Sequence, residues 1–550
     1  MKHVVRCSLL LIVPFVFTFS AAAQYAKVSS GLKIMISAHP LAAKAGLEVY
    51  QKGGNVVDVA VAVAYALGVV EPHGSGIGGE GMMLIYDAKQ KKYTVVDFKG
   101  ISPQAASYRT LDLEKKSEWA RSAKGASVPG AVAGLELARE KFGKLNRATV
   151  LQPAIDYAIK GFEVDSTLAL NLESYRRILE KDPYTRSIYY PGDQVPKIGA
   201  IVKNIDYGKT LTRIQAEGVD AFYRGDIAER IVRDMQKRGG FFTKEDLLAY
   251  RPIIREALTG TYRGFDIITT PPPCGGMLLI ETLNILKYFD MKEGRKADEY
   301  NLHLYAEVFK LMFKDEQAHN GDPDFNRIPV KKVLSDEFAF QRFLKVNLAR
   351  AAQGQQVGAG TADDKNTTQL CVMDIDGNTV SLTITLSSLF GTGQTVEGAG
   401  FILNNEMQNF HADAKHPNSL QPHKRVVTSL VPTILARDGR PMYVIGTPGG
   451  DLIISTIAQV IINLIDFEMP LREAICAPRM FSIFTQPELE IEGGHGEKSY
   501  RLLGTLGHEL KRYDGMRAYF GAVQSIMFDA PSNKLIGCSD PRRSGAAVGK

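Results

Sequence analysis

Near the start of the chain, apolar residues recur with a helical period. The stretch from Ile34 to Pro72 is rich in alanine and valine and has a helical pattern throughout. Pro40 suits the first turn of a helix that Gly53 would end. Asn55 is a favourable N-cap for a second helix that runs through Leu67. We therefore expect two consecutive helices here.

The middle of the chain is predominantly helical, and the later part mixes strands with helices. Residues 100–360 contain neither an internal repeat nor a linker that would divide them. The clearest helical periods after Pro72 cover Gly130–Phe142, Val150–Ile159, Asp226–Lys237, Met277–Leu286, Ala297–Ala318 and Leu452–Ile465. Strand patterns occupy Met82–Tyr86, Val95–Lys99, a segment ending at Thr269–Pro273, Gly400–Asn404 and Leu430–Leu435.

The stretch from Asn366 to Thr385 has the clearest hairpin pattern. Apolar and β-branched residues flank Asp376-Gly377, a dipeptide typical of two-residue hairpin turns. A turn there would pair Ile375 with Asn378 and set Thr368 opposite Thr385. Threonine hydroxyls would then meet at the open end of the hairpin. Because threonine is common in strands anyway, this spacing alone does not identify a site.

The N-terminus has the architecture of a secretory signal peptide. Lys2 and Arg6 precede an apolar run from Leu9 to Phe19, and Ala21-Ala22-Ala23 offers small residues at a cleavage point. This run is too short for a membrane span, and no later stretch is long and apolar enough for one. Cys7 precedes the apolar run, which argues against a lipoprotein. We expect loss of residues 1–23 and export to the periplasm or the extracellular space.

Composition excludes some classes of function. Lys and Arg total 66 against 60 Asp and Glu, and the small surplus forms no runs, so nothing favours nucleic-acid binding. Hydrophobic residues make up 45% of the chain, enough for a large core. Of five cysteines, Cys7 would leave with the signal peptide. The others permit two disulfides, but their spacing forms no framework and favours free thiols: Cys274, Cys371, Cys476 and Cys538.

One glycine-rich block, Gly74–Gly79, matches the letters GxGxxG. A dinucleotide site requires a strand before this motif and a helix after it. Here a helical pattern precedes it and the strand Met82–Tyr86 follows. We interpret the block as a turn beside closely packed backbone, and no pattern in the sequence calls for a cofactor or metal.

Several motifs spread over the chain occur together in one known enzyme family. They are Asn366-Thr367-Thr368, Phe390-Gly391-Thr392-Gly393, Leu403-Asn404-Asn405-Glu406-Met407, Gly446-Thr447-Pro448-Gly449-Gly450 and Gly537–Gly545. With the block Gly74–Gly79 and the strand ending at Lys99, they resemble the γ-glutamyltransferase (glutathione hydrolase) family from about residue 30 to 548. The resemblance implies an α+β fold, the four-layer αββα sandwich of N-terminal-nucleophile hydrolases.

The resemblance also implies that the chain cuts itself. In this family the cut precedes the first threonine of the pair, here between Asn366 and Thr367, and yields a large chain 24–366 and a small catalytic chain 367–550 that stay together in one domain. The patternless segment Ala351–Lys365 would be the exposed tether that such a junction requires. The freed Thr367 would be the nucleophile, because its own α-amine supplies the base that a weakly nucleophilic hydroxyl needs.

Further catalytic roles follow from the same resemblance. Thr385 would orient Thr367 through a hydrogen bond. Gly449 and Gly450 stand at a strand-to-helix turn, where free backbone N–H groups can hold an oxyanion. A tight turn alone would also explain this glycine pair.

Other positions correspond to the family's binding residues for the α-carboxylate and α-ammonium of a γ-glutamyl group. Thr428 and Ser429 match two serines that bind the carboxylate. Lys99 replaces a carboxylate-binding arginine, which keeps the charge but loses the planar fork. Glu406 occupies a position that binds the ammonium.

The chain departs from the family at several of these positions. Asn409 replaces an aspartate that pairs with the ammonium, which removes charge assistance. Ser387 replaces an asparagine of bacterial members. The loop Phe410–Lys424 is short and lacks a lid tyrosine, so we expect an open pocket that admits bulkier groups. Three histidines in this loop fit no metal spacing and are expected to be solvated: His411, His416 and His423.

The resemblance therefore implies an enzyme that transfers a γ-glutamyl group from glutathione or another γ-glutamyl amide to water or an amino acid, through a Thr367 acyl-enzyme and without a cofactor. One alternative is a cephalosporin-acylase-like glutaryl amidase of the same family, which Asn409 favours. Another is an uncleaved, non-catalytic binding protein, which the intact pairs Asn366-Thr367 and Gly449-Gly450 argue against.

Overall fold

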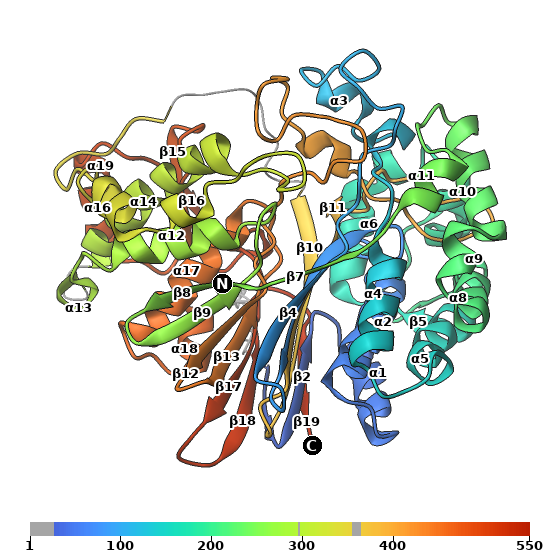
Figure 1. The fold of residues 1–550 in the computed structure, drawn as a ribbon, viewed down its shortest axis with the longest axis horizontal. Coiled ribbons are helices and arrows are strands. Elements are labelled where there is room, and N and C mark those ends of the chain that lie inside the picture. Colours follow the sequence, from blue (N-terminus) through green and yellow to red (C-terminus); the bar gives the residue numbers. More distant parts are fainter. Residues whose placement is uncertain (1–26, 295–297, 355–364) are drawn as a thin grey trace, which may run out of the picture.

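The computed structural model describes residues 27–294, 298–354 and 365–550, which form two stacked β-sheets between two layers of helices (Figure 1). Each sheet has seven strands. In spatial order the first consists of β1 (Lys27–Gly31), β18 (Lys534–Ser539), β17 (Gln524–Asp529), β13 (Arg440–Gly446), β12 (Thr433–Arg437), β9 (Phe265–Thr269) and β8 (Leu258–Tyr262). The second consists of β19 (Ala546–Gly549), β2 (Lys33–Ser37), β10 (Lys365–Asp374), β11 (Thr379–Ser388), β3 (Glu80–Asp87), β4 (Lys92–Asp97) and β7 (Ile253–Arg255).

The helices lie on the outer faces of the two sheets (Figure 1). The layer on the β10 sheet comprises α1 (Pro40–Gln51), α2 (Val56–Val70), α4 (Ala131–Phe142), α5 (Arg147–Lys160), α6 (Ser166–Leu179), α7 (Pro183–Tyr189), α8 (Ile205–Glu217), α9 (Val219–Tyr223), α10 (Asp226–Lys237) and α11 (Lys244–Ala249). The layer on the β13 sheet comprises α12 (Gly276–Leu286), α13 (Met291–Gly294), α14 (Asp298–His319), α15 (Val330–Val333), α16 (Asp336–Phe343), α17 (Leu452–Ile465), α18 (Leu471–Cys476) and α19 (Glu497–Thr505). The fold is thus the expected αββα sandwich.

Smaller elements surround this core. The strands β14 (Met480–Phe481), β15 (Glu488–Glu492) and β16 (Glu509–Tyr513) form one small sheet, and β5 (Phe162–Glu163) pairs with β6 (Ile201–Val202). The short helix α3 (Lys116–Trp119) lies at the top of the molecule in Figure 1.

The central hairpin of β10 and β11 is buried on both faces. On β10, Leu370 and Val372 pack into the core beneath α1 and α2, whereas Cys371 and Met373 pack between the two sheets. Because side chains alternate along a strand, the even positions of β11 also face the helices and its odd positions face the other sheet. Ser381 confirms this, since its hydroxyl donates to the carbonyl of Ile445 on β13 at 3.2 Å.

The hairpin forms where expected but with a register that differs by one residue. Met373 pairs with Thr379, and Thr368 pairs with Ile384 rather than Thr385, so the expected pairs were wrong. The cause is the Asp374 carboxylate, which accepts bonds at 2.9 Å from both the backbone and the side-chain nitrogen of Asn378. These bonds close a loop longer than a two-residue turn.

Most other expected elements are present, with three differences. Ile34–Ser37 is not helical but belongs to β2, because β10 and β19 pair with it on both sides. Gly400–Asn404 forms only isolated bridges, and the strand expected from Leu430 begins at Thr433. The remaining boundaries shift by a few residues.

The glycine-rich block lies between α2 and β3, as expected for a turn beside packed backbone. A Cβ on Gly78 would come within 2.1 Å of the carbonyl oxygen of Ile402, and one on Gly79 within 2.2 Å of that of Thr385. Only glycine permits these approaches. The block therefore brings β3 against the strand that carries Thr385.

Some expectations concern segments outside the described residues, namely the signal peptide with Cys7 and most of the tether before Asn366. The cysteines Cys274, Cys371, Cys476 and Cys538 are free thiols, which confirms the prediction from their spacing. Within the described segments, no helix has both the length and the apolar character that crossing a membrane requires.

Candidate active site

The Asn366–Thr367 junction is buried near the start of β10. The Thr367 hydroxyl donates to Thr385 Oγ1 at 3.3 Å, and the Thr385 hydroxyl donates to the carbonyl oxygen of Asn366 at 2.7 Å. The Thr367 N–H donates to Asn366 Oδ1 at 2.8 Å. One hydroxyl is thus placed beside the peptide bond that precedes it, and a second hydroxyl is bonded to the carbonyl of that bond.

Local backbone irregularities produce this arrangement. The register of β10 against β11 shifts between Asn366 and Thr368, so Thr367 lies in a β-bulge. On the facing strand, Ser387 has a φ of +77°, an unusual value for a residue with a side chain. Its backbone N–H donates to Thr385 Oγ1 at 2.8 Å. Because Thr385 accepts there, its own proton is directed to the Asn366 carbonyl.

A cavity of about 530 Å³ opens at this junction. Most of the residues predicted from the sequence line it, namely Thr367, Thr385, Ser387, Glu406, Asn409, Thr428, Ser429 and Gly450. Three predicted residues, Lys99, Gly449 and the cleavage-site residue Asn366, are not among the lining residues. Residues from β10, β11, the loops after them and the turn before α17 therefore converge on one space.

Gly449 and Gly450 form the turn between β13 and α17. Their φ angles are +140° and +57°, which a residue with a side chain rarely adopts. Neither backbone N–H donates a hydrogen bond to any part of the chain that the structure describes. Gly450 lines the cavity, so its amide is placed as an oxyanion donor would be, and that role stays a prediction.

Asn409 connects two other predicted residues. Its side-chain nitrogen donates to Ser387 Oγ at 3.0 Å and to Glu406 Oε2 at 2.7 Å. An amide nitrogen has two protons, and both are used here. Asn409 can therefore offer only its carbonyl oxygen to an ammonium group in the cavity.

Lys99 lies behind the cavity wall. Its ammonium is fully buried and donates to Glu80 at 2.7 Å and to Thr428 Oγ1 at 2.8 Å. Burial by itself would lower the pKa of Lys99, but the Glu80 carboxylate holds that pKa above its ordinary value. Lys99 thus reaches the cavity only through Thr428. Glu80 escaped the sequence analysis because it stands between two glycines at the start of β3, where no spacing pattern marks it.

A second group missed from the sequence lies behind the junction. Glu71 accepts a short bond from the Thr368 hydroxyl, and Arg543 donates to the carbonyl oxygen of Thr367 at 3.1 Å. Burial alone would raise the pKa of Glu71, yet contacts with His73, Arg543 and Thr368 hold it below its ordinary value. The one available signal was an acid directly after the apolar helix α2.

The segment around α3 forms a further wall that the sequence did not suggest. Lys116 and Arg121 line the cavity, and each is fixed by a bond to a backbone carbonyl, of Phe410 at 2.7 Å and of Gly391 at 2.7 Å. An apolar cluster attaches this segment to the loop after Glu406, with members Leu111, Trp119, Met407, Phe410, Leu420 and Val426. The short loop is therefore covered by α3.

Two of the three loop histidines, His411 and His416, pack against each other, whereas the His423 side chain stays 40% exposed. The rings of His411 and His416 stack with centroids 3.8 Å apart, and burial lowers the pKa of His416 to about 4. His423 Nε2 lies 3.3 Å from Asp246 Oδ1. The expectation of solvated rings was therefore wrong for His411 and His416, which stack on each other in a loop that the α3 segment packs over.

A different group of side chains has ligand atoms close enough for a metal: His303, Glu307 and His508. Here the two ring nitrogens bond each other at 2.8 Å, and Lys310 lies 3.0 Å from the Glu307 carboxylate. The two histidine nitrogens are thus bonded to each other, and Lys310 neutralises Glu307. The group is a polar cluster whose ligand atoms are already used. It is not among the cavity-lining residues.

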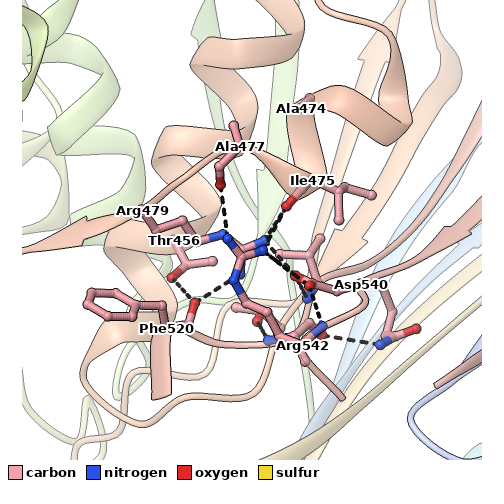
Figure 2. A network of polar contacts seen from close by, with 12 residues as sticks. Thr456, Ala474, Ile475, Ala477, Arg479, Phe520, Asp540 and Arg542 are labelled. Atoms are coloured by element: carbon pink, nitrogen blue, oxygen red, sulfur yellow. Dashed lines mark hydrogen bonds and ion pairs between the residues drawn. The ribbon is translucent and has the colours of Figure 1, made fainter. Parts of the chain in front are cut away.

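Figure 2 shows a buried polar network in which Arg479 and Arg542 converge on Asp540. Asp540 accepts from Arg479 at 2.6 Å and from Arg542 at 3.2 Å, and Arg479 also donates to the carbonyl of Phe520 at 2.9 Å. The Phe520–Ala522 segment contacts Thr447, whose hydroxyl accepts from the Ala522 N–H at 2.9 Å. The network thus supports the loop on which the Gly449 turn rests.

Asp540→Asn is expected to lower the free energy of unfolding by about 3–5 kcal/mol, because it leaves the buried Arg479 without its paired carboxylate, whereas Arg542 keeps Glu492. Chemical denaturation measures the loss. Asp336→Asn is the matched control, since Asp336 pairs with Lys287 at the surface, and a change below about 1 kcal/mol is expected there. Equal losses in both variants would contradict the assigned importance of the network.

Comparisons with known proteins agree with this geometry. The family model described as Gamma-glutamyltranspeptidase matches residues 42–550. The glutathione hydrolase proenzyme of Escherichia coli (strain K12) is 35% identical over 531 residues, 92% of this chain and 90% of that protein. The acylase ACY 1 proenzyme of Pseudomonas sp. (strain SE83) is 34% identical over 547 residues, 98% of this chain and 96% of that protein.

A solved structure extends the comparison to the fold. The crystal structure of cephalosporin acylase from Bacillus halodurans matches with a TM-score of 0.87 and 28% sequence identity, covering 98% of this chain and 99% of that chain. Sequence and fold thus agree over nearly the whole length. The chain is therefore an enzyme that belongs to the gamma-glutamyltranspeptidase family of N-terminal-nucleophile hydrolases.

Proposed function

We propose that this chain is an exported, self-cleaving enzyme that transfers a γ-glutamyl group from glutathione or a related γ-glutamyl amide to water or an amino acid. One observation carries the proposal: the Thr367 hydroxyl lies at a cavity wall, next to a peptide bond whose carbonyl accepts from Thr385. The curated relatives named as glutathione hydrolase proenzymes support the choice of donor.

Self-cleavage uses the junction as it stands. The Thr367 hydroxyl attacks the carbonyl carbon of Asn366, and the Thr385 hydroxyl stabilises the negative charge that develops on the carbonyl oxygen. The peptide C–N bond breaks, its nitrogen takes a proton, and an ester links Asn366 to Thr367 Oγ1. Water hydrolyses this ester and releases the Thr367 α-amine.

Turnover then repeats the same chemistry on a substrate. The free α-amine takes the proton of the Thr367 hydroxyl as it attacks the amide carbonyl of the donor. The N–H groups of Gly449 and Gly450 hold the oxyanion, and the leaving amine takes the proton. Water or the amino group of an acceptor then attacks the acyl-enzyme and regenerates Thr367.

The proposed binding roles follow the lining of the cavity. Thr428 and Ser429 donate to the carboxylate of the γ-glutamyl group, and Glu406 with the carbonyl of Asn409 accepts from its ammonium. Lys99 contributes through Thr428. No step requires a cofactor.

The two products of cleavage, residues 24–366 and 367–550, are proposed to stay together. Each sheet contains strands from both sides of the junction, so separation would break both sheets. The sequence pattern of residues 1–23 supports export to the periplasm or the extracellular space.

Two measurements test the proposal. Intact-mass analysis of purified protein should give two chains, one beginning at Thr367, and that protein should release p-nitroaniline from γ-glutamyl-p-nitroanilide. An uncut chain that binds ligands without turnover would favour the non-catalytic alternative. Full amidase activity in an uncut chain would contradict the role of the α-amine.

A glutaryl amidase is the second candidate, because Asn409 stands where a carboxylate would pair with the donor's ammonium. The acylase relative at 34% identity supports this candidate. Both candidates share the cleavage, the nucleophile and the oxyanion donors, so they differ only in the acyl group.

Asn409→Asp is expected to raise the ratio of kcat/KM for γ-glutamyl- over glutaryl-p-nitroanilide by about ten- to a hundredfold. This is the fold-change that corresponds to the free energy of one hydrogen bond to a charged group. The new carboxylate would face Glu406 where the amide now donates at 2.7 Å. Two adjacent carboxylates repel, and an ammonium between them relieves the repulsion. Gln408→Glu, which adds the same charge at the neighbouring lining residue, is the matched control. An unchanged ratio in Asn409→Asp would place residue 409 outside the ammonium site.

A further inference from the structure

A buried ion pair lies directly behind the cavity wall that Thr428 forms. Lys99 and Glu80 are both fully buried, and the Lys99 ammonium donates to Glu80 Oε1 at 2.7 Å. The other oxygen of Glu80 accepts from the Gly100 N–H at 2.6 Å. The two side chains therefore form an electrically neutral unit.

The same ammonium determines how Thr428 meets a ligand. Lys99 Nζ donates to Thr428 Oγ1 at 2.8 Å, so this oxygen accepts one bond and keeps its own proton for another partner. Cys274 Sγ lies 3.6 Å from the same oxygen, but burial raises the pKa of this thiol to about 12, so it brings no charge. A ligand at Thr428 therefore meets a neutral hydroxyl rather than a cation.

This neutrality has consequences for the ligand. A carboxylate is costly to desolvate unless it meets a positive charge or several donors. At Thr428 and Ser429 it finds hydroxyl donors but no uncompensated charge, so an acyl group that lacks the carboxylate loses comparatively little. Without Glu80, Lys99 would be a buried cation without a counter-ion. A ligand carboxylate at Thr428 would then compensate its charge.

We infer that Glu80 is a specificity-determining residue, which neutralises Lys99 and thereby lets the cavity accept acyl groups without a terminal carboxylate. This inference rests on the proposed acyl transfer and adds the class of donor: simple aliphatic acyl amides as well as dicarboxylic ones. Glu80 does not line the cavity and acts through Lys99 and Thr428, so it is a positioning residue.

The test uses glutaryl-p-nitroanilide and butyryl-p-nitroanilide, which differ only in the terminal carboxylate. In the cleaved wild type, kcat/KM for the glutaryl donor should exceed that for the butyryl donor by less than about a hundredfold. Glu80→Gln keeps the side-chain shape and an acceptor for Gly100, and should raise this ratio at least about tenfold, through KM. The inhibition constant of glutarate relative to butyrate should fall in parallel, which a purely structural ion pair would not cause.

Two further variants separate charge from packing. Lys99→Met in the Glu80→Gln background removes the cation as well, so the gain in ratio should disappear. Glu136→Gln removes an equally buried acid that pairs with Arg147 on another element, and the ratio should stay at the wild-type value.

The outcomes are distinguishable. An unchanged ratio of glutaryl over butyryl kcat/KM in Glu80→Gln overturns the inference. A ratio above about a hundredfold in the wild type also overturns it, before any variant is made. If the cleaved wild type hydrolyses neither these donors nor γ-glutamyl-p-nitroanilide, the proposed function itself is wrong.

Discussion

Thr367→Ala is expected to abolish self-cleavage and to leave hydrolysis lower by on the order of a million-fold, the scale seen when a nucleophile is removed from a catalytic unit. The hydroxyl that attacks the Asn366 carbonyl is also the hydroxyl that attacks the donor, so both activities should disappear together. Intact-mass analysis reports cleavage, and p-nitroaniline release reports turnover.

Thr367→Ser is the conservative comparison, because serine keeps both the hydroxyl and, after cleavage, an α-amine base. It should be cut and should retain activity. Thr368→Ala tests the neighbouring threonine, whose hydroxyl bonds Glu71 instead of the junction. If the Thr367→Ala chain is still cut, or if the small product begins at residue 368, the nucleophile is not Thr367.

The order of helices and strands was predictable because, over long stretches of the chain, apolar residues recur with either the helical or the strand spacing. The helix at Leu452–Ile465 was predicted with both ends correct, and the alternation of β10 and β11 placed Thr385 near the junction. The hairpin register was not predictable, since it depends on whether the Asp374 carboxylate bonds Asn378. A single side-chain contact thus shifted the pairs from Thr368 to Met373 by one residue, and the bulge at Thr367 restores the expected register at Asn366.

The position of Thr367 at the cavity was predictable from the sequence, whereas contacts that depend on a partner far along the chain were not. Lys99 was expected to bind a carboxylate directly, but Glu80 pairs with it across neighbouring segments. Arg543 contacts the carbonyl of Thr367 from a position 176 residues further along the chain. No spacing pattern marks such partners, because only the folded sheet brings them together.

Thr385→Val should slow self-cleavage by about a hundred- to a thousandfold, the usual loss when one oxyanion donor is removed. The Thr385 hydroxyl donates to the carbonyl oxygen of Asn366 at 2.7 Å, and that oxygen becomes negative as Thr367 attacks. Valine keeps the shape of the side chain but cannot donate. The appearance over time of the chain beginning at Thr367 measures the rate.

Loss of the Thr385 hydroxyl also leaves the Ser387 N–H without its acceptor, so a matched control must carry a similar structural cost. Thr383→Val is suitable, because Thr383 is buried on the same strand and face and donates to Gln369 Oε1 at 2.6 Å, away from the junction. Thr385→Ser should restore cleavage, since it restores the donor. If Thr385→Val is cut as fast as Thr383→Val, self-cleavage does not depend on a hydrogen bond from this hydroxyl to the Asn366 carbonyl.

Once the chain is cut, Asn366 no longer holds the Thr385 hydroxyl, which is then free to orient Thr367. Cleaved Thr385→Val should therefore lose less in turnover than the precursor loses in cleavage.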